Sequence, residues 1–197
     1  MNRVIVLRHG KTKSNLRRAY CGHTDVSLCP EGRTELETLR ASARYPSCEG
    51  YEVVTSGMKR TDETLRALYG DIPFRAEEAF REIHFGVFED KSYEELKDRA
   101  DYQAWISGDV TRNRPPGGES AEEMTARMLA RFHALTKGDG KKLLIVSHGG
   151  PIGFLMLSLF PGEREGWYDW QPKNGCGYMI ELDGTKALSY QPVPEET

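Results

Sequence analysis

The sequence predicts an α/β fold: a three-layer αβα sandwich with a mostly parallel central sheet, helices on both faces and a short inserted cap. Apolar runs typical of buried strands, at 4–7 and 143–146, alternate with segments of helical periodicity. Strands that alternate with helices build a parallel sheet covered on both faces. The 197 residues are 38% hydrophobic and 29% charged, a composition that suits one globular domain over 1–197.

The first half of the chain predicts strand and helix in alternation. The expected elements are a strand at 3–8, a long loop, a helix at about 31–44, a strand at 52–55, a helix up to about 69, a short strand at 73–75 and a loop at 80–90. Pro30 suits the first position of a helix, where its missing N–H costs nothing. Ser56 can cap the second helix, and Gly70 can end it.

The second half begins with the inserted cap, about 83–118, which is too short to be a domain. The expected elements are helical turns at 93–97 and 102–105, a long helix opened at 120, a strand at 142–147, a helix at 151–160 and paired strands at 178–182 and 187–190. Ser120 and Glu123 form a capping box. Pro151 suits a helix start, and Asp183-Gly184 suits a hairpin turn. We expect the tail at 192–197 to fray.

Composition excludes several classes of protein. The net charge of −3 argues against a general nucleic-acid binder. No apolar run is long enough to span a bilayer, and the first strand follows Met1 too closely for a signal peptide, so we expect a cytoplasmic protein. Four cysteines, at 21, 29, 48 and 176, form no CxxC pair, which argues against a disulfide framework and against a zinc cluster. We expect no metal and no cofactor.

Positive charge is concentrated in residues 1–24. This segment contains Arg3, Arg8, Lys11, Lys13, Arg17 and Arg18, and no acidic residue occurs before Asp25. Basic residues beside a strand end indicate a small anionic ligand. A solvated basic loop is the alternative for Lys11, Lys13, Arg17 and Arg18.

Two histidines follow predicted strands near opposite ends of the chain. The first strand ends in RHG at 8–10, and the strand at 142–147 leads into SHGG at 147–150. In open α/β sheets, ligands bind outside the carboxyl ends of the strands, where both histidines would lie. Histidine is a competent nucleophile near neutral pH, and arginine binds phosphate in a planar, bidentate way. The pattern therefore indicates phosphoryl transfer.

Several motifs resemble those of the histidine phosphatase superfamily, also called the phosphoglycerate mutase-like family. They are LRHGKTKSN at 7–15, YCGHTDVSL at 20–28, TSGMKRT at 55–61, REIHFGVFE at 81–89, GGES at 117–120 and SHGG at 147–150. The RHG tripeptide alone is weak evidence. The motifs together, in the order found in the family, are strong evidence.

The resemblance implies a role for each site residue. His9 would be the nucleophile that forms a phosphohistidine, and Glu82 would be the general acid and then the base. Phosphoryl oxygens would be bound by Arg8, Arg60 and His148, with Asn15 assisting; Cys21 (through its backbone), Gly22 and Gly149 complete the implied substrate-binding set. Taken outside its motif, Glu82 is more typical of a surface carboxylate in an acid-rich stretch. Lys11, Cys21, Cys29 and Asp90 depart from the usual family pattern, and none of them removes a catalytic group.

The resemblance favours a phosphatase over a mutase, because only residues 83–147 separate Glu82 from His148 and leave room for a short cap. The segments 20–25 and 167–177 are similar to phosphatases that act on α-ribazole 5′-phosphate. The expected activity is metal-independent hydrolysis of a small phosphorylated metabolite by a monomer or homodimer, with no nucleic-acid or membrane partner. A cofactor-dependent phosphoglycerate mutase and a catalytically silent phospho-ligand-binding module stay open. The sequence also leaves open which substrate is used. It does not decide whether substrate is contacted by Arg112, Arg114 or the aromatic residues at 105 and 167–170.

Overall fold

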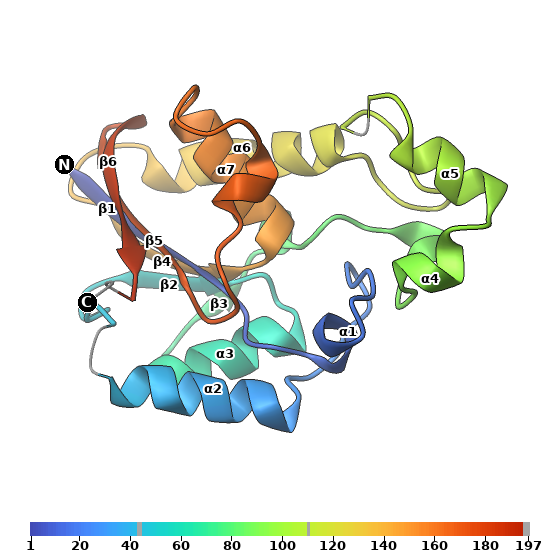
Figure 1. The fold of residues 1–197 in the computed structure, drawn as a ribbon. Helices are drawn as coiled ribbons and strands as arrows, with labels where there is room; N and C mark the ends of the chain where they lie inside the picture. The colour runs from blue at the N-terminus through green and yellow to red at the C-terminus, as the bar shows by residue number, and fades with distance from the viewer. Residues whose placement is uncertain (43–44, 110, 195–197) are drawn as a thin grey trace.

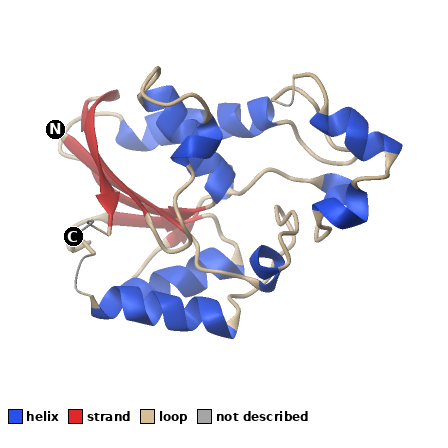
Figure 2. Ribbon diagram, viewed as in Figure 1, coloured by secondary structure: helices blue, strands red, loops and turns tan. Residues whose placement is uncertain are grey.

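A six-stranded sheet lies between two layers of helices in the computed structural model, which describes residues 1–42, 45–109 and 111–194 (Figures 1 and 2). Its strands are β1 (Asn2–Arg8), β2 (Glu52–Thr55), β3 (Arg75–Ala76), β4 (Lys142–Ser147), β5 (Gly177–Asp183) and β6 (Lys186–Val193). Their order is β3-β2-β4-β1-β5-β6. The first four strands in this order run parallel, and β5 runs antiparallel to both of its neighbours, β1 and β6. The predicted mostly parallel sheet is therefore confirmed.

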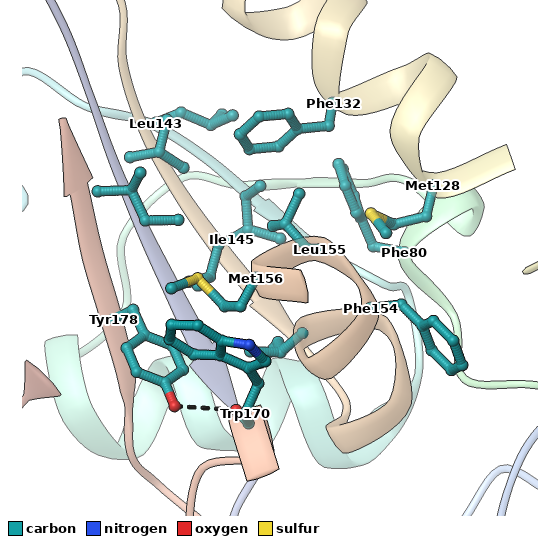
Figure 3. Close-up of a cluster of buried hydrophobic side chains, with 14 of the residues drawn as sticks. Phe80, Met128, Phe132, Leu143, Ile145, Phe154, Leu155, Met156, Trp170 and Tyr178 are labelled. Atoms are coloured by element: carbon teal, nitrogen blue, oxygen red, sulfur yellow. Dashed lines mark hydrogen bonds between the residues drawn. The ribbon is translucent and has the colours of Figure 1, made fainter. Parts of the chain in front are cut away.

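Two pairs of helices cover the faces of the sheet. Helices α2 (Pro30–Ala41) and α3 (Lys59–Tyr69) lie on one face, and α6 (Ala121–Thr136) and α7 (Gly149–Leu159) lie on the other (Figure 1). Alternate side chains of a strand point to opposite faces. Val4 and Val6 accordingly belong to the core under α6 and α7, which includes Trp170 (Figure 3). Ile5 and Leu7 belong to the core under α2 and α3.

The cap contains two short helices, α4 (Tyr93–Leu96) and α5 (Ala100–Ile106), which extend beyond the strands (Figure 1). Phe88, Leu96 and Tyr102 are buried there as a small apolar cluster. The other short elements are α1 (Lys13–Leu16) and the 3-10 turns Glu78–Phe80, Gly86–Phe88 and Trp167–Trp170. Helix α1 and the turn Gly86–Phe88 fall where the sequence predicted loop, and the turn Glu78–Phe80 ends where that predicted loop begins. They are too short to produce a periodic pattern.

The starts of two helices differ from the prediction. Helix α3 begins at Lys59 with Met58 at the N-cap, so the predicted cap at Ser56 is wrong. Gly57, at φ +76°, turns the chain between β2 and α3 and leaves Ser56 buried at the strand end. Helix α7 begins at Gly149 rather than at Pro151. A proline is tolerated anywhere in the first turn, because the N–H groups there have no acceptor within the helix.

Strand and helix ends differ in smaller ways. The strand predicted at 73–75 pairs only at Arg75–Ala76, and helix α2 ends at Ala41. Residues 43–44 of the predicted helix, and 195–197 of the tail, lie outside the described residues. The predicted fraying is wrong for Pro192 and Val193, which belong to β6, and the Val193 side chain is only 2% exposed. Among the described residues, no helix combines the length and apolarity needed to cross a membrane.

Candidate active site

His9 and His148 lie side by side at the carboxyl edge of the sheet. Strands β1 and β4 pair in parallel with Arg8 opposite Ser147, so the residue after each strand is a histidine. The two rings are 5.1 Å apart between centroids and meet at 61°. The predicted convergence of the two strand ends is therefore present.

The His9 imidazole has one nitrogen engaged and one available. Nδ1 lies 2.7 Å from the Gly10 carbonyl oxygen. A carbonyl only accepts, so Nδ1 carries the proton and Nε2 keeps its lone pair. Burial lowers the pKa of His9 well below its usual value, and the charges of Arg60 and Arg8 lower it further. The ring is therefore neutral at pH 7 and able to act as a nucleophile.

Arg60 is a fully buried cation at the start of α3. Its guanidinium donates to the carbonyl oxygens of Thr24 (3.0 Å) and Gly22 (2.6 Å), and its Nε donates to Nδ1 of His148 (3.3 Å). Within the described residues it forms no ion pair. A buried charge without a counterion is costly, so this position favours the arrival of an anion.

His148 is also fully buried, behind His9. Its Nδ1 accepts from Arg60, which leaves the proton on Nε2, and Nε2 donates to Ser56 Oγ at 2.8 Å. This contact explains the buried Ser56 hydroxyl that does not cap α3. Burial and the charge of Arg60 lower the pKa of His148 well below its usual value, so the ring is neutral.

Glu82 projects from the irregular loop after the first 3-10 turn. Its carboxylate accepts the N–H of Gly150 and the N–H of Ile83, each at 3.0 Å. Burial raises the pKa of Glu82, although these two hydrogen bonds and the charge of Arg8 oppose the rise. A carboxyl with a raised pKa stays protonated to higher pH, as a general acid requires.

Arg8 contacts the cleft while most of its guanidinium is buried. Nη1 donates to the Pro172 carbonyl oxygen at 2.9 Å, and the buried Nε has no hydrogen-bond partner among the described residues. A Cβ on Gly149 would lie 3.2 Å from Arg8 Cζ and 3.0 Å from Gln171 Cδ. The first glycine of SHGG is therefore needed for the close packing of Arg8 and Gln171 against α7.

A cleft of about 460 Å³ opens over these residues. Of the residues expected to contact substrate or take part in catalysis, Arg8, His9, Asn15, Cys21 and Glu82 line it. The other expected residues, Gly22, Arg60, His148 and Gly149, do not appear in its lining and lie behind it. The structure thus brings the expected set together in two layers, with the neutral His9 between the cleft and the buried Arg60.

A model of the histidine phosphatase superfamily (branch 1) matches residues 4–189. The chain belongs to this superfamily. The adenosylcobalamin/alpha-ribazole phosphatase of Salmonella typhimurium is 28% identical over 187 residues, covering 91% of this chain and 90% of that protein. A 2,3-bisphosphoglycerate-dependent phosphoglycerate mutase of Gloeobacter violaceus is 30% identical over 172 residues, covering 79% of this chain and 74% of that protein.

The solved structure of the alpha-ribazole phosphatase from Shigella flexneri has the same fold, with a TM-score of 0.80 at 25% identity. The similarity covers 94% of this chain and 93% of that one. These matches confirm the family resemblance and the fold class. Membership implies a phosphatase or a mutase activity.

In this superfamily member the aromatic residues divide between cleft and core. Trp105, Trp167 and Tyr168 line the cleft. Trp170 is fully buried, and its carbonyl accepts the Tyr178 hydroxyl at 2.9 Å (Figure 3). Arg112 and Arg114 do not line the cleft. Arg114 pairs with Glu123, and Arg112 lies 3.5 Å from Asp109 and 3.6 Å from Glu122.

The basic residues of the loop after β1 lie in two different environments, the surface and the cleft. Lys11 pairs with Glu35 at 2.5 Å, and Arg17 pairs with Asp90 at 3.5 Å, both on the surface. Arg18 instead lines the cleft, from a backbone at φ +52°. This conformation is uncommon for a residue with a Cβ, and such strain gathers at functional sites. The prediction of an anion-binding residue therefore fits Arg18, and the alternative of a solvated basic loop fits Lys11 and Arg17.

The position of Gly22 is structural rather than open to a ligand. Its N–H donates to the Glu89 carboxylate at 3.0 Å, and its carbonyl accepts from Arg60. Glu89 also accepts the N–H groups of His23, Thr24 and Phe85, and these bonds lower its pKa although burial opposes them. The Asn15 side chain accepts the Thr12 N–H at 3.0 Å in the cap of α1 while the residue lines the cleft.

Sequence reasoning missed Glu89, Gln171 and Arg127 as contributors to the site. Glu89 lies inside the REIHFGVFE motif, and its place in that motif was the available signal. Gln171 comes from the segment after α7 and reaches the site only through tertiary packing. Arg127 lies on the exposed side of a helical pattern, where nothing in the sequence indicates a contact with the Glu82 loop.

Proposed function

We propose that the protein is a phosphomonoester hydrolase that forms a phosphohistidine on His9 and uses Glu82 for proton transfer. One observation carries the proposal. His9 lines the cleft with Nδ1 bound to the Gly10 carbonyl and with the Nε2 lone pair unprotonated. The same cleft contains the cation Arg8 and the carboxyl of Glu82.

In the first step, His9 Nε2 attacks the phosphorus atom and the bond between phosphorus and the alcohol oxygen breaks. Glu82, whose pKa burial raises, acts in its protonated form: it gives its proton to that oxygen, and the neutral alcohol leaves. Arg8 and the buried Arg60 offset the charge of the phosphoryl oxygens, since preformed cations in a buried site need little reorganisation. We assign Asn15, Cys21 and His148 to the same phosphoryl pocket.

In the second step, ionised Glu82 takes a proton from water while the water oxygen attacks phosphorus. The bond between phosphorus and Nε2 breaks, phosphate leaves, and Glu82 is protonated again for the next cycle. The cleft of about 460 Å³ has room for water after the alcohol leaves.

Two guanidinium groups supply the positive charge that a metal ion provides in other phosphatases, which supports a metal-independent reaction. The substrate we propose is a small phosphorylated metabolite. The similarity to alpha-ribazole phosphatases supports α-ribazole 5′-phosphate as a substrate to test first. The short cap, limited to α4 and α5, supports hydrolysis over return of the phosphoryl group to a bound acceptor.

The test measures phosphate release from α-ribazole 5′-phosphate, phosphoserine and 3-phosphoglycerate, with and without a chelator. We expect His9→Ala to reduce release at least ~10³-fold, as expected when a nucleophile is removed. The control His133→Ala, which changes an exposed histidine on α6, retains full activity. Full activity in His9→Ala contradicts the mechanism, and loss of activity with chelator contradicts metal independence. Isomerisation of 3-phosphoglycerate without phosphate release identifies a mutase instead.

A further inference from the structure

Arg127, a partly buried residue of α6, reaches the loop that carries Glu82. Its Nη1 donates to the Ala79 carbonyl oxygen at 2.7 Å. Its Nη2 donates to the carbonyl oxygens of Arg81 at 2.9 Å and Glu82 at 3.0 Å. One guanidinium therefore holds the backbone that leads up to the proposed acid, including the carbonyl of Glu82 itself, and does not itself line the cleft.

Glu119 holds this guanidinium in a fixed plane. Arg127 Nε lies 3.0 Å from Glu119 Oε2, and Nη2 lies 2.6 Å from Oε1. The pair is well shielded, with the two side chains 26% and 18% exposed. A bidentate pair of this kind fixes orientation as well as distance. Glu119 also accepts the His84 N–H at 3.1 Å, so the carboxylate binds the same loop two residues after Glu82.

The Glu82 carbonyl receives a second donor from the loop after β1. His23 Nε2 lies 3.1 Å from that oxygen, so the nitrogen carries the proton. The His23 ring stacks on His84 at 4.6 Å between centroids. Side-chain donors from two sides, Arg127 and His23, therefore fix a segment that has no regular secondary structure between its two 3-10 turns.

Placement of the backbone decides where the Glu82 carboxylate lies. Its carboxylate oxygens are bound to the N–H groups of Ile83 and Gly150, which ties the side chain to two fixed backbone positions. A shift of the carbonyl at Glu82 must therefore move the carboxyl or break one of these bonds. Catalytic groups need placement to about 0.5 Å.

We propose that Arg127, oriented by Glu119, is a positioning residue that holds Glu82 where it protonates the leaving oxygen. This inference rests on the proposed function. The inference predicts a selective effect, which general destabilisation of the protein does not. Loss of Arg127 should slow the hydrolysis only of substrates whose leaving group needs a proton from Glu82. An alkyl alcohol leaves poorly without a proton, whereas p-nitrophenolate leaves well as an anion.

The experiment compares kcat/KM of Arg127→Gln on glycerol 2-phosphate and on p-nitrophenyl phosphate. The ratio kcat/KM reports the first transfer step and excludes the later attack of water. We expect a ~10- to 100-fold loss on the alkyl ester, part of the ~10²- to 10⁴-fold that general acid catalysis supplies, and less than ~3-fold on the aryl ester. Arg127→Lys, which keeps the charge and one donor, restores part of the loss.

Arg131→Gln is the matched control. Arg131 lies one turn further along α6 and forms its own bidentate pair, with Glu77, without bonding to the Glu82 loop carbonyls. It should leave both rates unchanged. Glu119→Gln provides a second test if Arg127→Gln does not fold, and it should show the same selective loss. Equal losses on both esters, or no loss in a folded variant, overturn the inference; failure of the proposed function appears separately, as activity in His9→Ala.

Discussion

The Glu82 carboxylate accepts the Gly150 N–H at 3.0 Å, which places the carboxyl against the first turn of α7. A Cβ on Gly150 would overlap Glu82 Oε1. The second glycine of SHGG is therefore the residue that allows the carboxyl to reach this helix. The free N–H groups of a first turn favour a negative charge, so the contact opposes the rise in the pKa of Glu82 that burial causes.

Gly150→Ala should displace Glu82 and reduce kcat/KM on an alkyl phosphate by about 10- to 100-fold, because misplacement by about 1 Å can cost 10²-fold. The measurement is steady-state phosphate release together with the melting temperature. Gly166→Ala is the control, since a Cβ there meets only an ordinary contact with Asp169 at 3.9 Å. Undiminished activity in Gly150→Ala would show that the carboxyl does not need this position.

Arg60→Met should weaken the binding of inorganic phosphate at least ~10-fold, a loss of about 1.4 kcal/mol, because it removes the buried cation behind His9. The carbonyl oxygens of Gly22 and Thr24 also lose their donor. The inhibition constant of phosphate measures the effect. Arg66→Met, on the exposed side of the same helix, should leave this constant unchanged. Equal inhibition constants for wild type and Arg60→Met would remove Arg60 from the anion site.

Stability should fall in mild acid because His9 and His148 are buried as neutral rings. Their pKa values are lowered well below the usual 6.5. The unfolded chain takes up protons as the pH falls through about 6.5, and the folded chain does not. The stabilisation is therefore complete above about pH 6.5 and decreases below it, by at most about 1.4 kcal/mol per pH unit for each histidine.

Urea unfolding at pH 7.5 and 5.5 measures this linkage, with His148→Gln as the variant that removes one of the two rings. The decrease in the free energy of unfolding between these pH values should be smaller in the variant. Glu82 acts in the opposite direction, because burial raises its pKa and ionisation at higher pH disfavours the folded state. This effect is present in both proteins and cancels in the comparison. Equal decreases would mean that His148 takes up protons in the folded chain as it does in the unfolded chain.

Local patterns carried most of the fold. The strands at β1, β2 and β4 follow from short apolar runs, and the start of α6 follows from the Ser120–Glu123 capping box, whose bonds are present. Helix starts were less predictable. Ser56 suits an N-cap by type, yet its hydroxyl bonds to His148, a residue distant in the sequence. A cap preference is weak compared with the need to satisfy a buried imidazole.

By itself the sequence determined that two strands end in histidine and glycine, because apolar runs and the residues after them are adjacent in the chain. It also determined the family motifs that include Arg60 and Glu82. Only the tertiary structure decided that His9 lines the cleft while His148 lies behind it, and that Arg18 lines the cleft while Arg17 pairs with Asp90. Only the tertiary structure shows that Gly150 and Arg127 bind Glu82. Those contacts depend on which distant segments pack together, and no local preference encodes that.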